Sequence, residues 1–272
     1  MTQDAILKPG INDVSNADYH KDRVYLSSSN LKTILTDLAK FHKEKILGIY
    51  EKQEHKTYFD EGSLTHAMIL EPDKVSRDFA FFPGWTKAGG LYEQFVLDNP
   101  KKTIISVPQK ARCDQYVEAF RRNKTAVNLI RNGLAEHTVC VDILGVPIKI
   151  RTDYINVDEG YIVDVKTSSM PVDVDSFRYI VGKYQYDLSA ALYLMVAEEF
   201  YGKPFDFYFP AIAKKDSVCE VFKLSQASRT KGELQVSKAI QIYKKCKETG
   251  IWESNAIVKK ELTVGDYEIL EV

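Results

Sequence analysis

The sequence predicts a mixed α/β (α+β) fold: a central mixed sheet flanked by helices and preceded by an N-terminal helical region. Three observations predict it. The 272 residues suit one domain, and the composition, 44% apolar and 28% charged, is ordinary for a globular protein. Helical patterns fill the first half of the chain. From residue 136 the sequence becomes β-rich with turn signals, and helical patterns return after residue 174.

The first half is predicted to be mostly helical. A long helix over residues 26–52 begins at a serine N-cap among Ser27, Ser28 and Ser29. A second, largely buried helix, "FDEGSLTHAMILEP", ends before Pro72. The glycines and lysine of "PGWTKAGG" indicate a surface loop in a mixed stretch. A third helix has proline in its first turn, "VPQKARCDQYVEAFRRN", and a short helix follows it.

The second half is predicted to hold the sheet. Three β-rich segments separated by turns form a meander: residues 136–145, 146–158 and 160–168. Helices follow over 175–202 with a break near Gly182. Two further strands, at residues 205–214 and 218–225, and a final helix through about Thr249 complete the pattern. We therefore expect one domain over 1–272, with a helical part (1–135), a sheet-bearing part (136–252) and a C-terminal tail (253–272).

Composition excludes several classes of site. The four cysteines are scattered without a C-x-x-C pair, so no disulfide framework, zinc site or iron–sulfur site is expected. The net charge of −1 argues against coating nucleic acid by bulk attraction, but it allows a local basic groove. No apolar run approaches the roughly 20 residues that span a bilayer, and "MTQDAILKPG" lacks signal-peptide features. We expect a cytoplasmic protein without a membrane partner.

Three acids and a lysine are predicted to converge on the meander. Asp164 and Lys166 lie two residues apart in "YIVDVKTSS", so they face the same side of a strand. Antiparallel pairing brings Asp153 within reach of Asp164, and Glu136 opens the preceding strand. Carboxylates this close repel one another and lose hydration, and a bound Mg²⁺ or Mn²⁺ removes both costs. Lys166 is not a ligand type, but it suits an attacking water or an anionic transition state.

Ordinary interpretations stand beside these. An isolated D-x-K is most often a surface ion pair contributing about 0–1 kcal/mol. The acid on the neighbouring strand and the polar "KTSS" turn favour a site here. His66, in "GSLTHAMIL", is either a core residue or a neutral metal ligand. Tyr186, Ser189 and Tyr193 share one helical face, which by periodicity alone is a packing face.

Six segments, taken in their order along the chain, resemble one known family: "YHKDRVYLSSSNLK", "EGSLTHAMILEP", "AEHTV", "IRTDYI", "IVDVKTSS" and "YQYDLSAALY". They look like the RecE-type phage and prophage exonucleases (exodeoxyribonuclease VIII catalytic domain). That family belongs to the PD-(D/E)XK nuclease superfamily, with lambda exonuclease and the RecB nuclease domains. The resemblance covers about residues 11–252. It implies a single nuclease domain with a restriction-endonuclease-like core.

The resemblance also implies roles. His66, Asp153, Asp164 and the backbone carbonyl of Val165 would hold metal, with Asp164 bridging two Mg²⁺ ions (Mn²⁺ as a substitute). Glu136 would act at the second metal or at the edge of the site, and Lys166 would orient the attacking water. The helix of Tyr186 and Tyr193 would support the site or the DNA backbone. That helix departs from the family pattern, because Ser189 stands where the family has glutamine. Gln185, one turn earlier, is the candidate replacement. For the DNA end or its 5′-phosphate, the candidates are Arg23, Ser29 (otherwise a plain N-cap residue) and Arg151.

The activity implied is 5′→3′ exonuclease cleavage of duplex DNA ends. It leaves a 3′ single strand for a RecT-like annealing protein, in a homo-oligomeric ring that threads DNA inside a bacterial host cell. One alternative is a single-strand or flap nuclease of the RecB or Cas4 type, which the missing iron–sulfur cysteines disfavour. Another is a non-catalytic DNA-binding assembly protein, against which the intact Asp153, Asp164 and Lys166 argue.

Overall fold

The computed structural model describes residues 6–50 and 57–252, so the predicted C-terminal tail and the end of the first predicted helix lie outside the described residues. In this part of the chain the main sheet has seven strands in the order β1-β4-β5-β6-β8-β7, with β9 also pairing β8. Their bounds are β1 Gly10–Asn12, β4 Leu134–Ile143, β5 Val146–Asn156, β6 Tyr161–Val163, β7 Lys166–Ser168, β8 Asp206–Ala213 and β9 Val218–Lys223. β8 runs parallel to β6 and β7 while the other pairs are antiparallel, so the predicted mixed sheet is confirmed.

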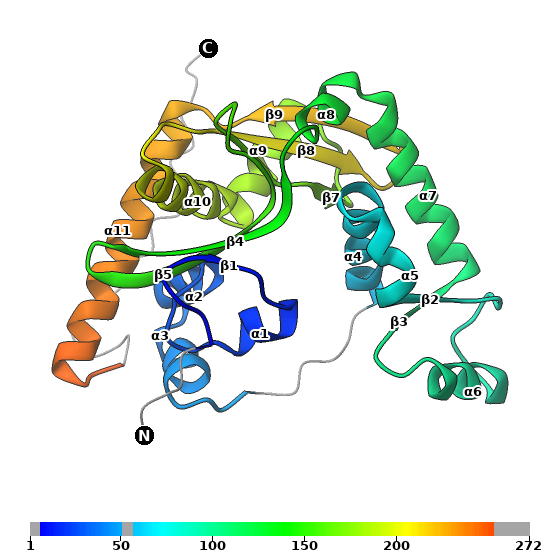
Figure 1. The fold of residues 1–272 in the computed structure, drawn as a ribbon, viewed down its shortest axis with the longest axis horizontal. Helices are drawn as coiled ribbons and strands as arrows, with labels where there is room; N and C mark the ends of the chain where they lie inside the picture. The colour runs from blue at the N-terminus through cyan, green and yellow to red at the C-terminus, as the bar shows by residue number, and fades with distance from the viewer. Residues whose placement is uncertain (1–5, 51–56, 253–272) are drawn as a thin grey trace, which may run out of the picture.

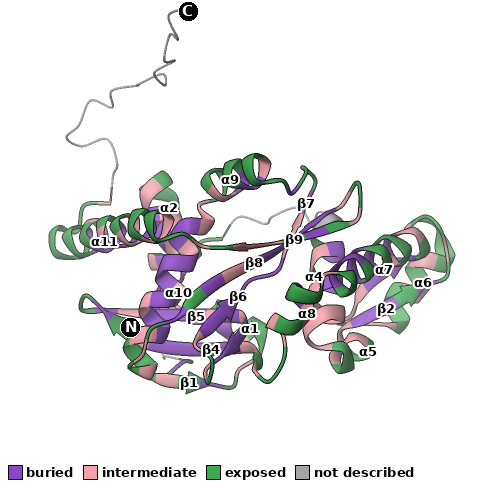
Figure 2. Cartoon of the chain, turned by 90° about the horizontal axis from the view of Figure 1, so that it is seen from above, coloured by how far each residue is buried: buried purple, intermediate pink, exposed green. Residues whose placement is uncertain are grey.

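Helices cover the sheet on both faces (Figure 1). A large core forms where α2, α3, α10 and α11 pack on β4 and β5, and a second forms where α7 and α8 pack on β5, β6, β8 and β9. Figure 2 shows β4, β5 and β6 as buried strands between helices with exposed outer sides. The helices are α1 Asn16–Lys21, α2 Ser28–Thr36, α3 Leu38–Phe41, α4 Thr57–Leu70, α5 Val75–Asp78, α6 Gly90–Asp98, α7 Val107–Arg122, α8 Lys124–Leu129, α9 Val174–Lys183, α10 Tyr186–Tyr201 and α11 Gln226–Thr249, with a π-helical turn His42–Ile46 and a 3₁₀ turn Pro72–Lys74.

A small parallel pair, β2 Phe79–Phe82 and β3 Thr103–Ser106, lies apart from the main sheet and carries α6. Both strands and α6 fall in or beside the stretch whose glycines suggested a surface loop. Within the described ranges, no helix has the length and apolar composition needed to cross a membrane.

The long first helix was predicted wrongly. It does begin at a serine, because Ser27 forms a capping box with Asn30, but α2 ends at Thr36. Asp37 has an extended φ of −151°, and its side chain accepts a hydrogen bond from the Lys40 amide at 2.9 Å. Asp37 therefore stops one helix and caps the next, because an aspartate offers the backbone a local alternative to helix.

The break in the helical hairpin lies beyond its predicted place. Gly182 is inside α9, and the chain turns at Tyr184 and Gln185 instead. Gln185 adopts a left-handed conformation with φ of 50°. It precedes α10 as its N-cap residue, so Gln185, the candidate replacement for the family glutamine, is not part of the helix that carries Ser189.

The third strand of the meander is interrupted at Asp164 and Val165. The Val165 amide donates to the Asp153 carboxylate at 2.8 Å, and the Asp164 amide donates to the Tyr208 carbonyl at 3.0 Å. β6 therefore pairs with β5 and β8, whereas β7 pairs only with β8. A side chain takes the place of a strand partner, so one continuous strand over 160–168 does not form.

A close helix crossing gives a stability prediction. A Cβ at Gly232 of α11 would lie 2.3 Å from the Asp187 carbonyl oxygen and 2.7 Å from the Ala191 Cβ of α10. Backbone and core atoms cannot move far enough to relieve this overlap. We therefore expect Gly232→Ala to lower the free energy of unfolding by about 1–3 kcal/mol, as measured by urea denaturation. The matched control is Gly182→Ala in α9, where no atom lies within 4 Å of the added Cβ. Equal stability of the two variants would contradict the packing argument.

Candidate active site

Two aspartates face each other where β5 and β6 separate. The ladder pairs Tyr154 with Val163 and Ile155 with Ile162, so the next opposed pair is Asp153 and Asp164. The two carboxyl groups are close enough to hydrogen-bond. Burial, followed by the repulsion of Asp164, raises the pKa of Asp153 well above its ordinary value. The antiparallel pairing expected from the sequence thus brings the two acids together.

Lys166, the first residue of β7, contacts Asp164 of this pair. Its Nζ lies 2.5 Å from Asp164 Oδ2. Burial alone lowers the pKa of a lysine, but the charges of Asp164 and Asp153 outweigh it, and the pKa of Lys166 is raised. Lys166 is therefore a cation at neutral pH. It donates hydrogen bonds at this site and does not accept a proton there.

His66 reaches the site from α4, which lies beside the end of β7 (Figure 1). Its Nδ1 is 3.3 Å from Asp153 Oδ2. Burial, followed by the charge of Lys166, lowers the pKa of His66 to about 4. The imidazole is therefore neutral at physiological pH and retains a nitrogen lone pair, as a metal ligand requires. Spacing left His66 open between core and site, and its contact with Asp153 places it at the site.

Glu136 and Arg151 form the edge of the site. Glu136 adopts a positive φ of 50° within β4, and its Oε2 accepts from Arg151 Nε at 2.7 Å. Glu136 also contributes to the raised pKa of Asp153. Arg151 donates further to the Val14 carbonyl at 3.2 Å. Arg151 therefore holds Glu136 beside the aspartates, and a role for it in DNA contact stays a prediction.

Helix α10 presents tyrosines to the site. The Tyr186 ring centroid is 4.9 Å from Lys166 Nζ. Tyr193 hydrogen-bonds with Ser28 of α2; burial first, and Asp164 and Asp153 among the charges, raise its pKa well above the ordinary value. The face that periodicity alone assigned to packing is thus next to the acids. Ser189 is partly exposed between these tyrosines.

The candidate phosphate residues lie near the start of α2. Ser29 is exposed in the first turn, with its Oγ 2.8 Å from Ser27 Oγ. Arg23 donates from Nε to the Lys45 carbonyl at 3.1 Å and from Nη2 to the Ile46 carbonyl. Those bonds tie Arg23 to the π-helical turn, so its geometry favours a structural role, and its binding of a phosphate stays a prediction.

The donor types at the site fit Mg²⁺ or Mn²⁺: two close carboxylates, a neutral imidazole and a main-chain carbonyl at Val165. Among the described residues, however, no three His, Cys, Asp or Glu side chains converge as metal ligands. Asp164 Oδ2 pairs with Lys166, and Asp153 Oδ2 accepts a hydrogen bond from the Val165 amide. The side chains supply a charge that favours a cation, without a preformed three-ligand cage.

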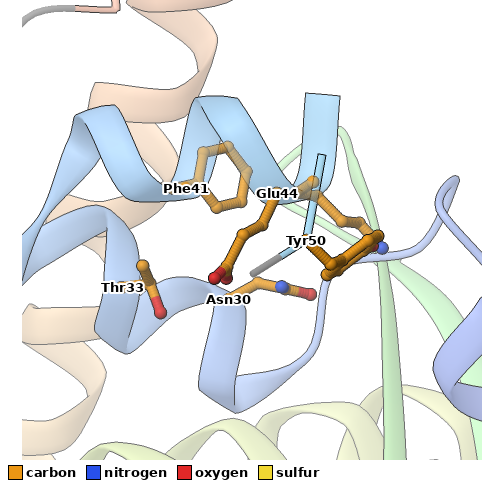
Figure 3. A pocket seen from close by; sticks show the side chains of 6 residues that line it. Asn30, Thr33, Phe41, Glu44 and Tyr50 are labelled. Atoms are coloured by element: carbon orange, nitrogen blue, oxygen red, sulfur yellow. The ribbon is translucent and has the colours of Figure 1, made fainter. Parts of the chain in front are cut away.

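A small hollow of about 50 Å³ lies elsewhere, beside α2 and the π-helical turn (Figure 3). Its lining includes Asn30, Thr33 and Glu44, and it contains none of the acids above.

Sequence reasoning missed Lys32 of α2, whose Nζ lies 5.5 Å from the centroid of the Tyr186 ring. Its only signal was its place in "SSSNLK", because nothing in the sequence brings α2 to α10.

Comparison with known proteins identifies a family and a shared fold. The sequence matches the family model "PDDEXK-like domain of unknown function (DUF3799)" over residues 27–256, and no curated protein matches it. The crystal structure named "Putative exonuclease" from Eubacterium rectale aligns with a TM-score of 0.60 and 16% identity, covering 93% of this chain and 97% of that one. A second solved structure, SSO0001, gives a TM-score of 0.29 and 13% identity, covering 77% and 86%.

The first likeness shows a common fold. The family match extends from the start of α2 through the end of α11, and so includes His66, Asp153, Asp164 and Lys166. The chain therefore belongs to the PDDEXK-like domain family DUF3799, within the PD-(D/E)XK nuclease superfamily.

Proposed function

We propose that this protein is a metal-dependent DNA exonuclease that hydrolyses phosphodiester bonds at the centre formed by Asp153, Asp164 and Lys166. The observation that carries the proposal is the ion pair of Lys166 with Asp164, one of two opposed acids, in a PDDEXK-like fold. A fixed cation beside acids that favour a divalent metal suits a reaction in which negative charge develops on phosphate.

Each residue of the site has a proposed role that follows from its chemistry. Asp153, Asp164, His66 and the Val165 carbonyl would hold Mg²⁺ or Mn²⁺, with two ions expected and Glu136 at the edge. The bound metal supplies charge stabilisation and a water of lowered pKa. Lys166 donates a hydrogen bond that orients the attacking water or the phosphate oxygen. The Tyr186 ring holds the lysine in place by a cation–π contact.

The preferred substrate in this proposal is a duplex DNA end, cut in the 5′→3′ direction to leave a 3′ single strand. The ordered motifs that resemble the RecE-type exonucleases support it, as does the exonuclease name of the structural neighbour. On the same basis we propose assembly as a homo-oligomeric ring, and a single-strand annealing protein as the consumer of the product. A single-strand or flap nuclease is the second candidate.

One assay tests these candidates. The full chain is given linear duplexes with and without a 5′-phosphate, closed circles, single strands and flaps, in Mg²⁺, Mn²⁺ or EDTA. We expect shortening of linear duplexes from the 5′ end with either metal, and intact circles. Preference for single strands or flaps would support the second candidate. Inertness toward every substrate and metal would leave a non-catalytic DNA-binding protein.

His66 gives a separate test of the metal site. We expect His66→Ala to weaken Mn²⁺ binding by about tenfold in a calorimetric titration, because the imidazole supplies a neutral nitrogen donor beside Asp153. The matched control is His20→Ala, at an exposed histidine of α1. An unchanged titration for His66→Ala would assign His66 to packing alone.

A further inference from the structure

Lys32 of α2 lies beside the active site although it is far from Lys166 in sequence. Its Nζ donates to the Tyr184 carbonyl at 2.8 Å and lies 5.5 Å from the centroid of the Tyr186 ring. Lys166 Nζ lies 4.9 Å from the same centroid. One aromatic ring thus holds two ammonium groups near each other, one from the catalytic strand and one from an N-terminal helix.

The charge of Lys32 has no carboxylate partner in the part of the chain that the structure describes. Among the described residues no Asp or Glu oxygen lies within ion-pair distance of its Nζ, whereas Lys166 has Asp164 at 2.5 Å. The nearby Asp187 is already paired with Lys231 at 2.8 Å. Burial, followed by the charge of Lys166, lowers the pKa of Lys32 to about 8, so most of it is still protonated at pH 7.

A half-buried cation beside another cation costs free energy in the free protein. An anion at this place would offset that cost. The Tyr186 ring and the Tyr184 carbonyl fix the direction of the ammonium group before the anion arrives. The exposed hydroxyl of Ser29, one turn earlier on α2, lies on the same N-terminal part of the helix.

We propose that Lys32 is a positioning residue that binds a phosphate of the DNA backbone next to the phosphate being cleaved. The proposal rests on the nuclease function proposed above and adds a specific contact to it. Lys166 acts at the scissile phosphate and Lys32 holds a neighbouring one, so the Tyr186 ring sets the spacing between the two contacts. A single ammonium group binds the charged phosphate and makes no contact with a base, so the contact does not depend on the DNA sequence.

The first test removes the charge and keeps the aliphatic stem. We expect Lys32→Met to raise KM for a linear duplex by about tenfold, with kcat changed by less than about threefold. We also expect the slope of log Kd against log salt to fall by about one, measured in Ca²⁺ to prevent cleavage. Lys32→Arg should recover most of the affinity. The control is Lys40→Met, at a lysine of α3 that already faces Glu44 at 3.9 Å, which should behave as wild type.

The second test locates the phosphate. Duplexes carrying one neutral methylphosphonate linkage at successive positions are bound by the wild type and by Lys32→Met. We expect one linkage near the cut to weaken wild-type binding but not binding by the variant, because that interaction is already lost. Additive penalties at every linkage, or a fall in kcat with unchanged KM, would overturn the proposal. Active wild type with unaffected Lys32→Met refutes this contact alone, whereas inert wild type refutes the nuclease itself.

Discussion

Lys166→Ala is expected to lower cleavage of linear duplex DNA by about 10³-fold while leaving DNA binding within a few-fold. The rate loss corresponds to about 4 kcal/mol in the barrier, because a fixed cation is removed from the place where phosphate charge develops. Affinity for duplex DNA generally comes from many phosphate contacts, so we expect one lysine at the reacting centre to contribute little to it. The measurements are single-turnover cleavage in Mg²⁺ and gel-shift titration in Ca²⁺.

The matched control is Lys223→Ala, which removes an exposed lysine of β9 that is paired with Asp206 of β8 at 2.7 Å. It should cleave at the wild-type rate, because the pair is screened by solvent. An active Lys166→Ala enzyme would remove the lysine from the mechanism. A variant that loses binding and cleavage together would show that Lys166 serves affinity instead.

Asp153→Asn is expected to stabilise the metal-free protein at neutral pH while abolishing cleavage. Burial and the nearby Asp164 raise the pKa of Asp153 well above its ordinary value, so the native state binds this proton more tightly than the unfolded chain. Stability from this group is therefore present at low pH and is lost as pH rises through the folded pKa. Asparagine cannot ionise, so the variant does not lose this stability as pH rises. Its side-chain amide oxygen can still accept the hydrogen bond from the Val165 amide.

The measurement is the free energy of unfolding in EDTA from pH 5 to pH 9. We expect wild type to lose stability toward high pH relative to Asp153→Asn, and we expect Mg²⁺ to raise the Tm of wild type alone. The control is Asp206→Asn, at an exposed carboxyl group whose partner is Lys223. Identical pH profiles and metal responses for wild type and Asp153→Asn would contradict both the repulsion and the metal site.

The sequence determined much of the sheet and its register. Alternation in "IRTDY" and "YIVDVK", with a short turn between them, fixed which residues face each other, so the opposition of Asp153 and Asp164 was predictable. The break in the strand after Val163 was not predictable. It arises because the Val165 amide donates its hydrogen bond to the Asp153 carboxylate. A periodic sequence pattern does not show that a side chain competes with a neighbouring strand for one backbone donor.

The helical surroundings of the site were predicted less well. Asp37 ends α2 with a φ of −151°, and Gln185 precedes α10 with a φ of 50°; an ordinary amphipathic pattern reveals neither backbone conformation. The role of His66 was open in the sequence, because an apolar helix offers the same pattern to a core and to a site. Its contact with Asp153 depends on how α4 packs on the sheet.

The sequence by itself determined the mixed fold and the opposition of the two aspartates, because strand periodicity and antiparallel pairing act over short separations in the chain. Only the tertiary structure decided that His66 comes to Asp153, that Glu136 is held by Arg151, and that Lys32 meets Lys166 at the Tyr186 ring. These contacts join helices and strands distant in sequence. Packing free energy, summed over a whole core, decides where such elements meet, and no local pattern encodes it.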